Sequence, residues 1–563
     1  MAKFAVLITY REIFNKEPSL AELQAILGKY QRRRVIILLA NINCLLGTWQ
    51  NTPQFEADAR LSDYLLCDFR QDLQNLRRQN SSKLVFSRLG ILYLIKQACL
   101  ACPENGLPLD TRSAHSALGV CVLMTNDLVL PFVPSASDGI VEKMTNLLPF
   151  SDYISHDHYS MDIGRTQFIF DEIAQLPALI ARPDFLDLRS LFRDYFEIDE
   201  KTFCELVFGC ASKFLGLKLE DLGSKPEVAV MRSTYFDKSK IPRDTITQFL
   251  TQVTITETVF VERVKESKSR PGDDLTIFQS FPLIEIAKGF YLCLDPGFIA
   301  DKAGRGLYWS LFEKLQDDQR AKLAGFWGAV FESYVNCVLQ RSYTVEGIFI
   351  PEPRFANGDA AFDACIVEGR NLLVLEHKSS VIRADAKYGG DASKLKKQLD
   401  LKFIEGDAEG SKGLTQLSKH LVRFLSGDKL GGIDAAEIDR VYPVMVCLES
   451  TMVTPYLGKY LNERFVDIYP REKFRQLITP IFTLEMADVE NLLGYLQSFL
   501  LSDIFESYYS NNKTMLTSLS SSNVPLLKNV NPQRNIVMDS FKKFSDAMAA
   551  DLFDENLGDS EDS

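Results

Sequence analysis

The chain has 563 residues, which is too long for a single hydrophobic core, so two or three domains are expected. Hydrophobic residues make up 46% and charged residues 25%, a globular composition that excludes a broadly disordered chain. The net charge of -12 argues against a surface that binds nucleic acid everywhere, but it leaves room for a local basic groove because charges are screened within roughly 10 Å.

No membrane-targeting segment is predicted. The first residues, MAKFAVLITYREIF, lack the design of a signal peptide, and the apolar run Val35–Gly47 is too short to cross a bilayer. The chain has eleven cysteines without regular spacing, which is typical of reduced thiols. We therefore expect a cytoplasmic protein that does not associate with membranes.

Residues 1–225 are predicted to form a mainly helical region. Apolar residues recur at three- and four-residue spacing in Leu20–Tyr30, Leu61–Arg78 and Leu92–Leu100. Ser19 followed by Glu22 predicts a capping box at the start of the first of these helices. The region is interpreted as a sensor or regulatory part.

Strand composition becomes common between residues 226 and 306. The segments Val253–Val264 and Phe281–Leu294 are typical of strands, and a hairpin is expected around Lys288–Gly289. The polar segment between them, Lys265–Asp274, predicts a loop. This β-containing part could pack on the helical region or form a small module of its own.

Residues 307–530 are predicted to form an α/β domain with a mixed sheet, so the fold class is multidomain, with a mainly helical N-terminal region preceding this domain. In chain order we expect a helix, three strands, a second helix and a fourth strand, over Leu323–Gln340, Tyr343–Ile350, Phe362–Val367, Leu372–His377, Leu414–Leu425 and Val441–Leu448. A polar stretch, Arg383–Lys412, separates the third strand from the second helix.

Residues 531–563 are expected to be an acidic, disordered tail. From Asp551 onward they contain six acidic residues and no basic residue. A tail that binds a partner or mimics DNA is the alternative.

Three charged residues of a predicted hairpin at positions 362–380 could carry chemistry. If Gly369–Arg370 is its two-residue turn, with glycine first as a type II′ turn prefers, Asp363 pairs directly with Glu376. Their Cβ atoms would then lie on one face of the sheet, roughly 4.5–5.5 Å apart. Lys378 projects from the same face, because it follows Glu376 by two residues.

Two facing carboxylates repel each other in a bare sheet, and a divalent cation reverses the sign of that interaction. Mg²⁺ prefers hard oxygen ligands, so Asp363 and Glu376 are predicted to bind Mg²⁺, with Mn²⁺ as the alternative ion. An ammonium such as that of Lys378 can orient a metal-bound water or stabilise charge on a phosphate. The competing interpretation is that the two acids are unrelated surface residues and that Lys378 neutralises one of them.

Asp363 followed by Glu376-His377-Lys378 resembles the motif of the PD-(D/E)XK nuclease superfamily, which includes the RecB-like and restriction-endonuclease folds. The resemblance covers Leu323–Leu448. It implies a restriction-endonuclease-like fold in which the aspartate, the glutamate and the lysine are catalytic. It also implies that Glu332, on the helix before the sheet, contributes to metal binding and catalysis, and that Gln416, on the helix after it, assists.

The sequence departs from the family pattern in two places. Phe362 stands where a proline often precedes the aspartate, and His420 stands where RecB-like members often have tyrosine. For Glu332 the alternative is a solvent-facing position, although Gly328 one turn earlier permits close approach of the helix backbone. For Gln416 the alternative is a capping or simple surface role.

Basic residues between Arg383 and Lys429 predict a surface that contacts phosphates. The residues chosen as nucleic-acid-binding are Lys394, Lys396, Lys397 and Lys412. Acidic residues intervene, so a solvated loop and helix is an equally supported interpretation.

The expected function is a Mg²⁺- or Mn²⁺-dependent nuclease that hydrolyses phosphodiester bonds, with DNA favoured over RNA. By analogy of architecture the chain resembles antiviral defence effectors that join a nuclease to a sensor, and a regulatory protein partner or a homo-oligomer is expected. The alternatives are a repair or recombination nuclease and a non-catalytic module that binds nucleic acid or protein on a nuclease-like fold.

Overall fold

The computed structural model describes residues 6–47, 54–129, 139–154, 159–218, 220, 227–267, 274–343, 345–405, 413–448, 454–470, 473–519, 522, 524–532 and 535–552. About 60% of the chain is helical, and the described strands form three small sheets. The chain folds into two compact units, each made of segments distant in sequence. Unit 1 comprises residues 1–2, 133–188 and 315–544, and unit 2 comprises residues 3–132, 189–314 and 545–563.

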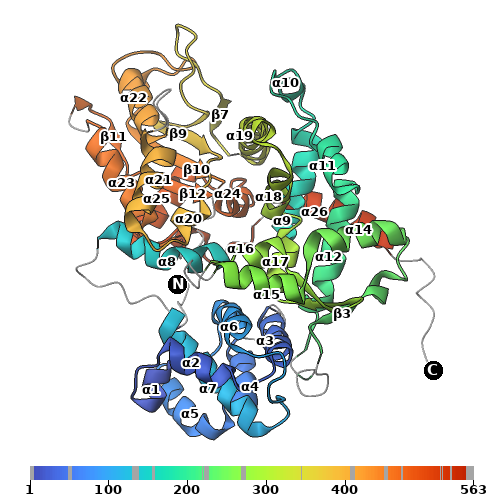
Figure 1. Ribbon diagram of the computed structural model, residues 1–563. Coiled ribbons are helices and arrows are strands. Elements are labelled where there is room, and N and C mark those ends of the chain that lie inside the picture. Colours follow the sequence, from blue (N-terminus) through green and yellow to red (C-terminus); the bar gives the residue numbers. More distant parts are fainter. Residues whose placement is uncertain are drawn as a thin grey trace. The chain divides into compact units, whose positions relative to one another are not determined.

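Unit 2 is mainly helical, and its N-terminal helices gather together in Figure 1 (blue). Its helices are α1 (Tyr10–Phe14), α2 (Leu20–Leu27), α3 (Arg32–Leu46), α4 (Gln54–Leu65), η1 (Cys67–Phe69), α5 (Arg70–Gln79), α6 (Arg88–Ala101), α7 (Arg112–Val129), α11 (Leu188–Phe196, entered from unit 1), α12 (Glu200–Leu215), η3 (Ser233–Phe236), α14 (Arg243–Val253), α15 (Glu257–Glu266), α16 (Thr276–Ser280), α17 (Pro296–Asp301) and α18 (Arg305–Lys314). The predicted capping box of α2 is confirmed, because Ser19 accepts from the amide of Glu22 while the Glu22 side chain accepts from that of Ser19.

Two small sheets belong to unit 2. Strands β1 (Val6–Leu7) and β2 (Lys83–Leu84) are parallel, and β3 (Val230–Arg232), β6 (Phe290–Cys293), β5 (Leu283–Ala287) and β4 (Thr254–Thr256) form a mixed sheet in that order. The predicted hairpin at Lys288–Gly289 is confirmed as the β5–β6 turn, where Gly289 has a φ of 76° that favours glycine.

The predicted strand over Val253–Val264 is wrong for most of its length. Only Thr254–Thr256 is extended, and α15 begins at Glu257. The Thr256 side chain accepts a hydrogen bond from the amide of Val259, which caps the helix, and Phe260, Val261 and Val264 are buried on one helical face. The cap and this spacing outweigh the β-branched composition.

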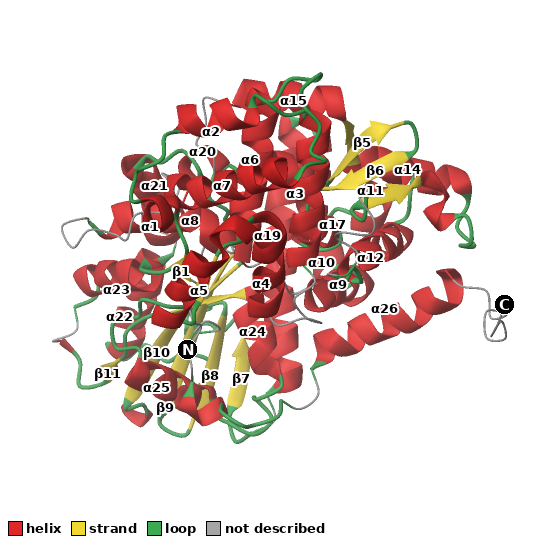
Figure 2. Ribbon diagram, turned by 90° about the horizontal axis from the view of Figure 1, so that it is seen from below, coloured by secondary structure: helices red, strands yellow, loops and turns green. Residues whose placement is uncertain are grey.

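Unit 1 is built around a six-stranded mixed sheet in the order β11-β10-β9-β8-β7, with β12 also paired to β10. Figure 2 shows β7 to β10 side by side. The strands are β7 (Ile348–Pro351), β8 (Ala364–Glu368), β9 (Asn371–Lys378), β10 (Arg440–Cys447), β11 (Leu477–Ile478) and β12 (Phe482–Glu485). The β7–β8 and β8–β9 pairs are antiparallel. β10 is parallel to each of its three partners, β9, β11 and β12.

Helices cover both faces of this sheet. The helices of unit 1 are α8 (Ile140–Ile154), α9 (Tyr159–Phe168), η2 (Ile169–Ile173), α10 (Pro177–Ile180), α19 (Asp317–Ser342), α20 (Ala384–Lys387), α21 (Ala392–Leu399), η5 (Asp400–Glu405), α22 (Leu414–Leu425), η6 (Ala435–Glu437), α23 (Leu457–Ile468), α24 (Met486–Leu493), α25 (Leu501–Asn511), η9 (Pro525–Leu527) and the start of α26 (Ile536–Leu552). On one face, α8, α20–α23 and η5 enclose an apolar cluster with Val374 and Met445. On the other, Phe331 of α19 packs edge-to-face on His377, and Glu506 of α25 accepts from the Tyr442 hydroxyl.

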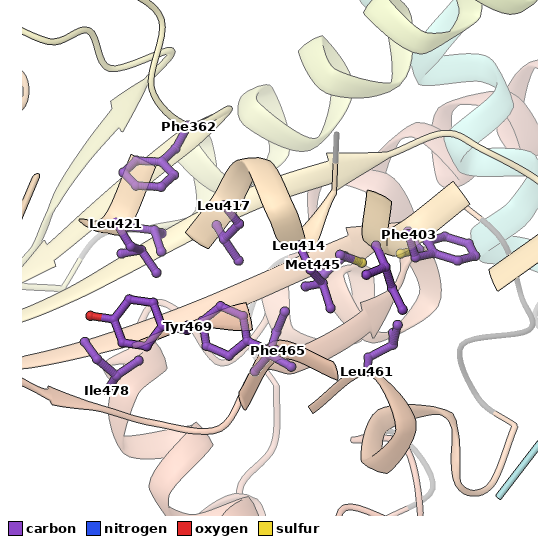
Figure 3. Close-up of a cluster of buried hydrophobic side chains, with 14 of the residues drawn as sticks. Phe362, Phe403, Leu414, Leu417, Leu421, Met445, Leu461, Phe465, Tyr469 and Ile478 are labelled. Atoms are coloured by element: carbon purple, nitrogen blue, oxygen red, sulfur yellow. The ribbon is translucent and has the colours of Figure 1, made fainter. Parts of the chain in front are cut away.

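The enclosed cluster explains why α22 forms where the sequence predicted it. Figure 3 shows Leu414, Leu417 and Leu421 of α22 in a row beside Leu461 and Phe465 of α23. The three leucines recur at three- and four-residue spacing and are fully buried. The predicted bounds of this helix, Leu414–Leu425, are confirmed.

Three expectations for this part of the chain need correction. The strand expected from Tyr343 begins only at Ile348, because α19 runs to Ser342. The polar stretch 383–412, expected only to separate a strand from a helix, forms α20, α21 and η5 in its described residues, since Leu395, Leu399 and Phe403 are buried in the cluster.

The third correction concerns the tail. Residues 536–552 form α26, with Val537, Phe544 and Met548 buried, so the expected disordered tail does not begin at residue 531. The acidic end, residues 553–563, lies outside the described residues. None of the described helices combines the length and apolarity needed to span a membrane.

Removing the Phe403 ring is expected to lower the free energy of unfolding by about 3–5 kcal/mol, because Phe403→Ala leaves a cavity in a fully buried position. Leu401→Ala is the matched control in the same π-helical segment, since Leu401 is 38% exposed, and it should cost much less. Urea denaturation followed by circular dichroism measures both. Equal, small losses would show that this segment does not belong to the core.

Candidate functional site

The β8–β9 hairpin brings the predicted acidic residues together. Its turn includes Gly369, whose φ of 60° favours glycine, and Glu368 pairs with Asn371 as the predicted register requires. The last pair in the ladder is Ala364 with Leu375, and the amide of Asp363 donates to the Leu375 carbonyl at 3.1 Å. The register is therefore confirmed, and Asp363 lies at the open end of β8.

Asp363, Glu376 and Lys378 form a connected set at the ends of these two strands. The amide of His377 donates to Oδ2 of Asp363 at 2.5 Å, which fixes that carboxylate against β9. Lys378 Nζ donates to Oε1 of Glu376, also at 2.5 Å. Glu376 is only 2% exposed, and its Oε2 has no hydrogen-bond partner within the described part of the chain. A buried carboxylate oxygen thus remains available at the centre of the site.

Burial and repulsion dominate the electrostatics of Glu376. Burial, with the nearby charge of Asp363, raises the pKa of Glu376 to about 7 even though Lys378 opposes the shift. Burial alone would lower the pKa of Lys378, but the attraction of Glu376 and then of Asp363 outweighs it and the pKa is raised. The lysine therefore keeps its proton at neutral pH.

Glu332 lies on α19 and approaches the site from a second element. A Cβ added at Gly328, one turn earlier, would lie 3.1 Å from Ser379 Oγ, so the helix passes close to the chain just after Lys378. The Glu332 side chain is exposed to solvent, as the alternative interpretation expected, yet partial desolvation and the repulsion of Asp363 raise its pKa to about 7. The structure therefore brings Glu332 within electrostatic reach of the two other acids.

Gln416 lies half-buried on α22. One turn later, Nδ1 of His420 bonds to the backbone carbonyl of Ala361, which precedes Asp363 by two residues. Residues four apart share a helix face, so Gln416 lies on the side of α22 that meets the site. It is not placed in contact with Asp363 or Glu376.

The basic residues chosen from the sequence divide into three groups. Lys394 and Lys397 are exposed on α21, and the ammonium of Lys396 pairs with Asp400. Lys412 lies outside the described residues. Two of the four are thus free to meet a phosphate backbone on the described surface.

Two further residues contact the site, one through its side chain and one through its backbone amide, and no pattern in the sequence indicated either of them. Asn336 donates from Nδ2 to the Asp363 carbonyl at 3.3 Å, and the amide of Glu352 donates to the same carbonyl at 3.0 Å. Glu352 has a φ of 45°, a strained conformation for a non-glycine residue, and its charge contributes to the raised pKa of Glu332. The available signal for Asn336 was its position one turn after Glu332, among the buried Tyr334, Val335 and Val338.

His377 is buried on the opposite face of β9, as strand alternation requires. Burial lowers its pKa to about 4, and within the described residues neither ring nitrogen has a hydrogen-bond partner. Its ring packs edge-to-face on Phe331 with centroids 6.4 Å apart. It is therefore a neutral packing residue beside the site.

The donor atoms suit a hard divalent cation. Asp363 and Glu376 offer carboxylate oxygens, and one oxygen of Glu376 is buried and unpartnered within the described structure. Burial and the repulsion of Asp363 raise the pKa of both Glu376 and Glu332. Across the described residues, no group of three or more His, Cys, Asp or Glu side chains stands ready to hold a metal. The predicted three-ligand set with Glu332 is therefore not assembled, and two carboxylates with backbone and water oxygens are the arrangement that fits.

Comparisons with protein-family models, with curated proteins and with solved structures find no match.

The melting temperature of the metal-free protein is expected to fall as the pH rises from about 5 to about 8, and to fall less in Glu332→Gln. The folded pKa of Glu332 is raised from 4.5 to about 7, so between these values the folded chain holds a proton that the unfolded chain has released. That stabilisation is complete below the unfolded pKa and is lost as the pH rises through about 7.

Calorimetry in a chelating buffer at several pH values measures this effect. Glu463→Gln, at an exposed glutamate of α23, is the control and should keep the wild-type profile. Parallel profiles for Glu332→Gln and wild type would contradict the assignment.

Proposed function

We propose that this chain is a metal-dependent nuclease that hydrolyses phosphodiester bonds, and that its six-stranded sheet with α19 and α22 is a restriction-endonuclease-like domain. The observation that carries the proposal is the open end of the β8–β9 hairpin. There, Asp363 lies beside the buried Glu376. One carboxylate oxygen of Glu376 accepts from Lys378, and the other has no partner within the described structure.

A purely structural ion pair does not account for this arrangement. Lys378 supplies one positive charge to two acids, while burial raises the pKa of Glu376 to about 7 and so opposes its ionisation below neutral pH. A divalent cation between Asp363 and Glu376 would relieve their repulsion and use the free oxygen. Mg²⁺, or Mn²⁺ in its place, would supply Lewis-acid activation of water and phosphate when bound.

The protein side chains then have separate roles. Asp363 and Glu376 hold the cation, and the charged ammonium of Lys378 donates to the attacking water or to a phosphate oxygen as negative charge develops there. Because the pKa of Lys378 is raised, it serves as a donor and not as a base. Glu332, whose pKa is about 7, is suited to accept a proton near neutrality, and Gln416 would assist from α22.

Substrate contacts are proposed on α21. Lys394 and Lys397 lie exposed there, three residues apart on one helix surface. α21 and α22 border the same apolar cluster, on the sheet face to which Glu376 belongs. The proposal extends to DNA as the favoured substrate and to unit 2 as the regulatory part of an antiviral defence effector.

Asp363→Ala and Lys378→Ala are each expected to slow cleavage of plasmid and oligonucleotide DNA at least about 100-fold in Mg²⁺ or Mn²⁺. The first removes a ligand of the cation, and the second removes the ammonium that donates to the developing phosphate charge. Asp439→Ala is the matched control. Asp439 is an exposed aspartate that pairs with Arg370 at the opposite end of the same strands. Gel assays measure DNA cleavage, and titration with Mn²⁺ measures metal binding.

Cleavage by wild type and by Asp439→Ala, but by neither site variant, supports the nuclease. Mn²⁺ binding that disappears in Asp363→Ala, without cleavage by any protein, locates the metal site and points to a missing activator. A wild-type protein that neither cleaves nor binds metal contradicts the proposal and leaves the non-catalytic binding module.

Charge reversal of the α21 lysines is expected to weaken nucleic-acid binding. In Lys394→Glu with Lys397→Glu, the slope of log affinity against log salt should fall by about 1 for each phosphate that a lysine no longer neutralises. Fluorescence anisotropy with labelled duplex and single strands, in Ca²⁺ to prevent cleavage, measures affinity and slope.

Lys459→Glu is the control, because Lys459 is a partly exposed lysine paired to Glu463 on α23. An unchanged slope in the double variant would remove α21 from the proposed binding surface without affecting the catalytic assignment.

A further inference from the structure

We propose that Asp363 is held in position by two side chains outside the D…ExK pattern, Asn336 of α19 and His420 of α22. Both bond to backbone carbonyls of the segment Ala361–Asp363, which leads into β8. The inference rests on the proposed function, in which Asp363 is a metal ligand. It assigns these two residues as positioning residues that act through the backbone.

Asn336 reaches the segment from α19. Its Nδ2 donates to the Asp363 carbonyl at 3.3 Å, and the residue is 9% exposed. Asn336 follows Glu332 by four residues, so one helical face presents both the acid and the amide toward Asp363. Within the described structure, the Oδ1 atom of Asn336 is buried and has no hydrogen-bond partner. Burying an unpaired amide oxygen costs free energy that an apolar side chain would not cost, so packing alone does not explain an asparagine at this position.

His420 reaches the segment from α22. A carbonyl only accepts, so the bond to Ala361 requires the proton of a neutral ring to be on Nδ1. The ring is fixed by edge-to-face contacts with Phe355 and Phe362, whose centroids lie 5.9 and 5.8 Å away. A half-buried imidazole with a defined tautomer and two aromatic neighbours is a rigid support.

The two helices lie on opposite faces of the sheet. α19 packs on His377, whose side chain points away from the apolar cluster, whereas the leucines of α22 belong to that cluster with Val374. The segment before β8 is therefore held from both sides.

The hydrogen bonds from Asn336 and His420 counteract the electrostatic repulsion that acts on Asp363. Asp363 lies among like charges, since it contributes to raising the pKa of both Glu332 and Glu376. Repulsion favours a rotation of its carboxylate away from β9, and it acts at the end of a strand where the ladder offers the least restraint. Two donors on the adjacent carbonyls oppose that movement and keep Asp363 next to the His377 amide, ready for a cation.

The test uses the full chain with Asn336→Leu, His420→Leu and the double variant. His420→Asn is the conservative rescue, because an asparagine amide can place a donor close to the position of Nδ1. Gln340→Leu, at an exposed position of α19, is the control. The two readouts are the dissociation constant for Mn²⁺ and the hydrogen-exchange rate of the His377 amide, which reports the Asp363 carboxylate whether or not metal binds.

Each single leucine variant is expected to weaken Mn²⁺ binding roughly 10–100-fold and to speed exchange at His377, while His420→Asn stays near wild type. The double variant should lose less than the product of the single effects, because both residues support one segment.

Wild-type Mn²⁺ affinity and exchange in both leucine variants would overturn the inference, as would a lower melting temperature with neither readout changed. If the wild-type protein binds no Mn²⁺, the proposed function fails, and the exchange rate alone decides whether the two residues position Asp363.

Discussion

The repulsion between carboxylates at the end of the β8–β9 hairpin is the constraint on which the site depends. Adjacent strands bring Asp363 and Glu376 together, and the burial of Glu376 removes water that would otherwise screen their charges. The surroundings answer this repulsion in three ways. Lys378 pairs with Glu376, the His377 amide holds Asp363, and protons are retained on Glu332 and Glu376 up to about neutral pH. A divalent cation bound between the carboxylates would reduce the repulsion further, and the arrangement of the carboxylates suits such an ion.

The apolar cluster on the same face of the sheet stabilises the fold against the repulsion between these carboxylates. Single pairs of charges contribute little when each must also be desolvated, so the strand ends are held mainly by the packing of α21, α22 and α23 against the sheet. The leucines of α22 fix the helix that carries both Gln416 and His420. The packing that stabilises the domain and the residues of the proposed site therefore lie on two sides of one helix.

The sequence was most informative where local rules apply. Strand alternation and a glycine at the turn were enough for the hairpin register, because side chains alternate with period two and the turn sets the pairing. The bounds of α22 followed from leucine spacing alone. The helices over 384–405 were missed because charged residues conceal the buried Leu395, Leu399 and Phe403, and because η5 departs from α-helical periodicity. Asn336 and Glu352 were missed because their role arises only from contacts between distant segments, which no local pattern encodes.

The discontinuity of unit 1 has a consequence for how the protein is made. Val141, Met144 and Leu148 of α8 belong to the apolar cluster, yet they leave the ribosome long before the strands and helices that bury them. Until α20, α21 and α23 have all been synthesised, these side chains lack their full set of native partners, and such exposed surface invites aggregation or chaperone binding. A recombinant fragment that begins at Leu307 would omit α8 and leave the same cluster uncovered. Soluble expression of the sheet on its own therefore calls for residues 133–188 to be supplied with it, as a fused or co-expressed segment.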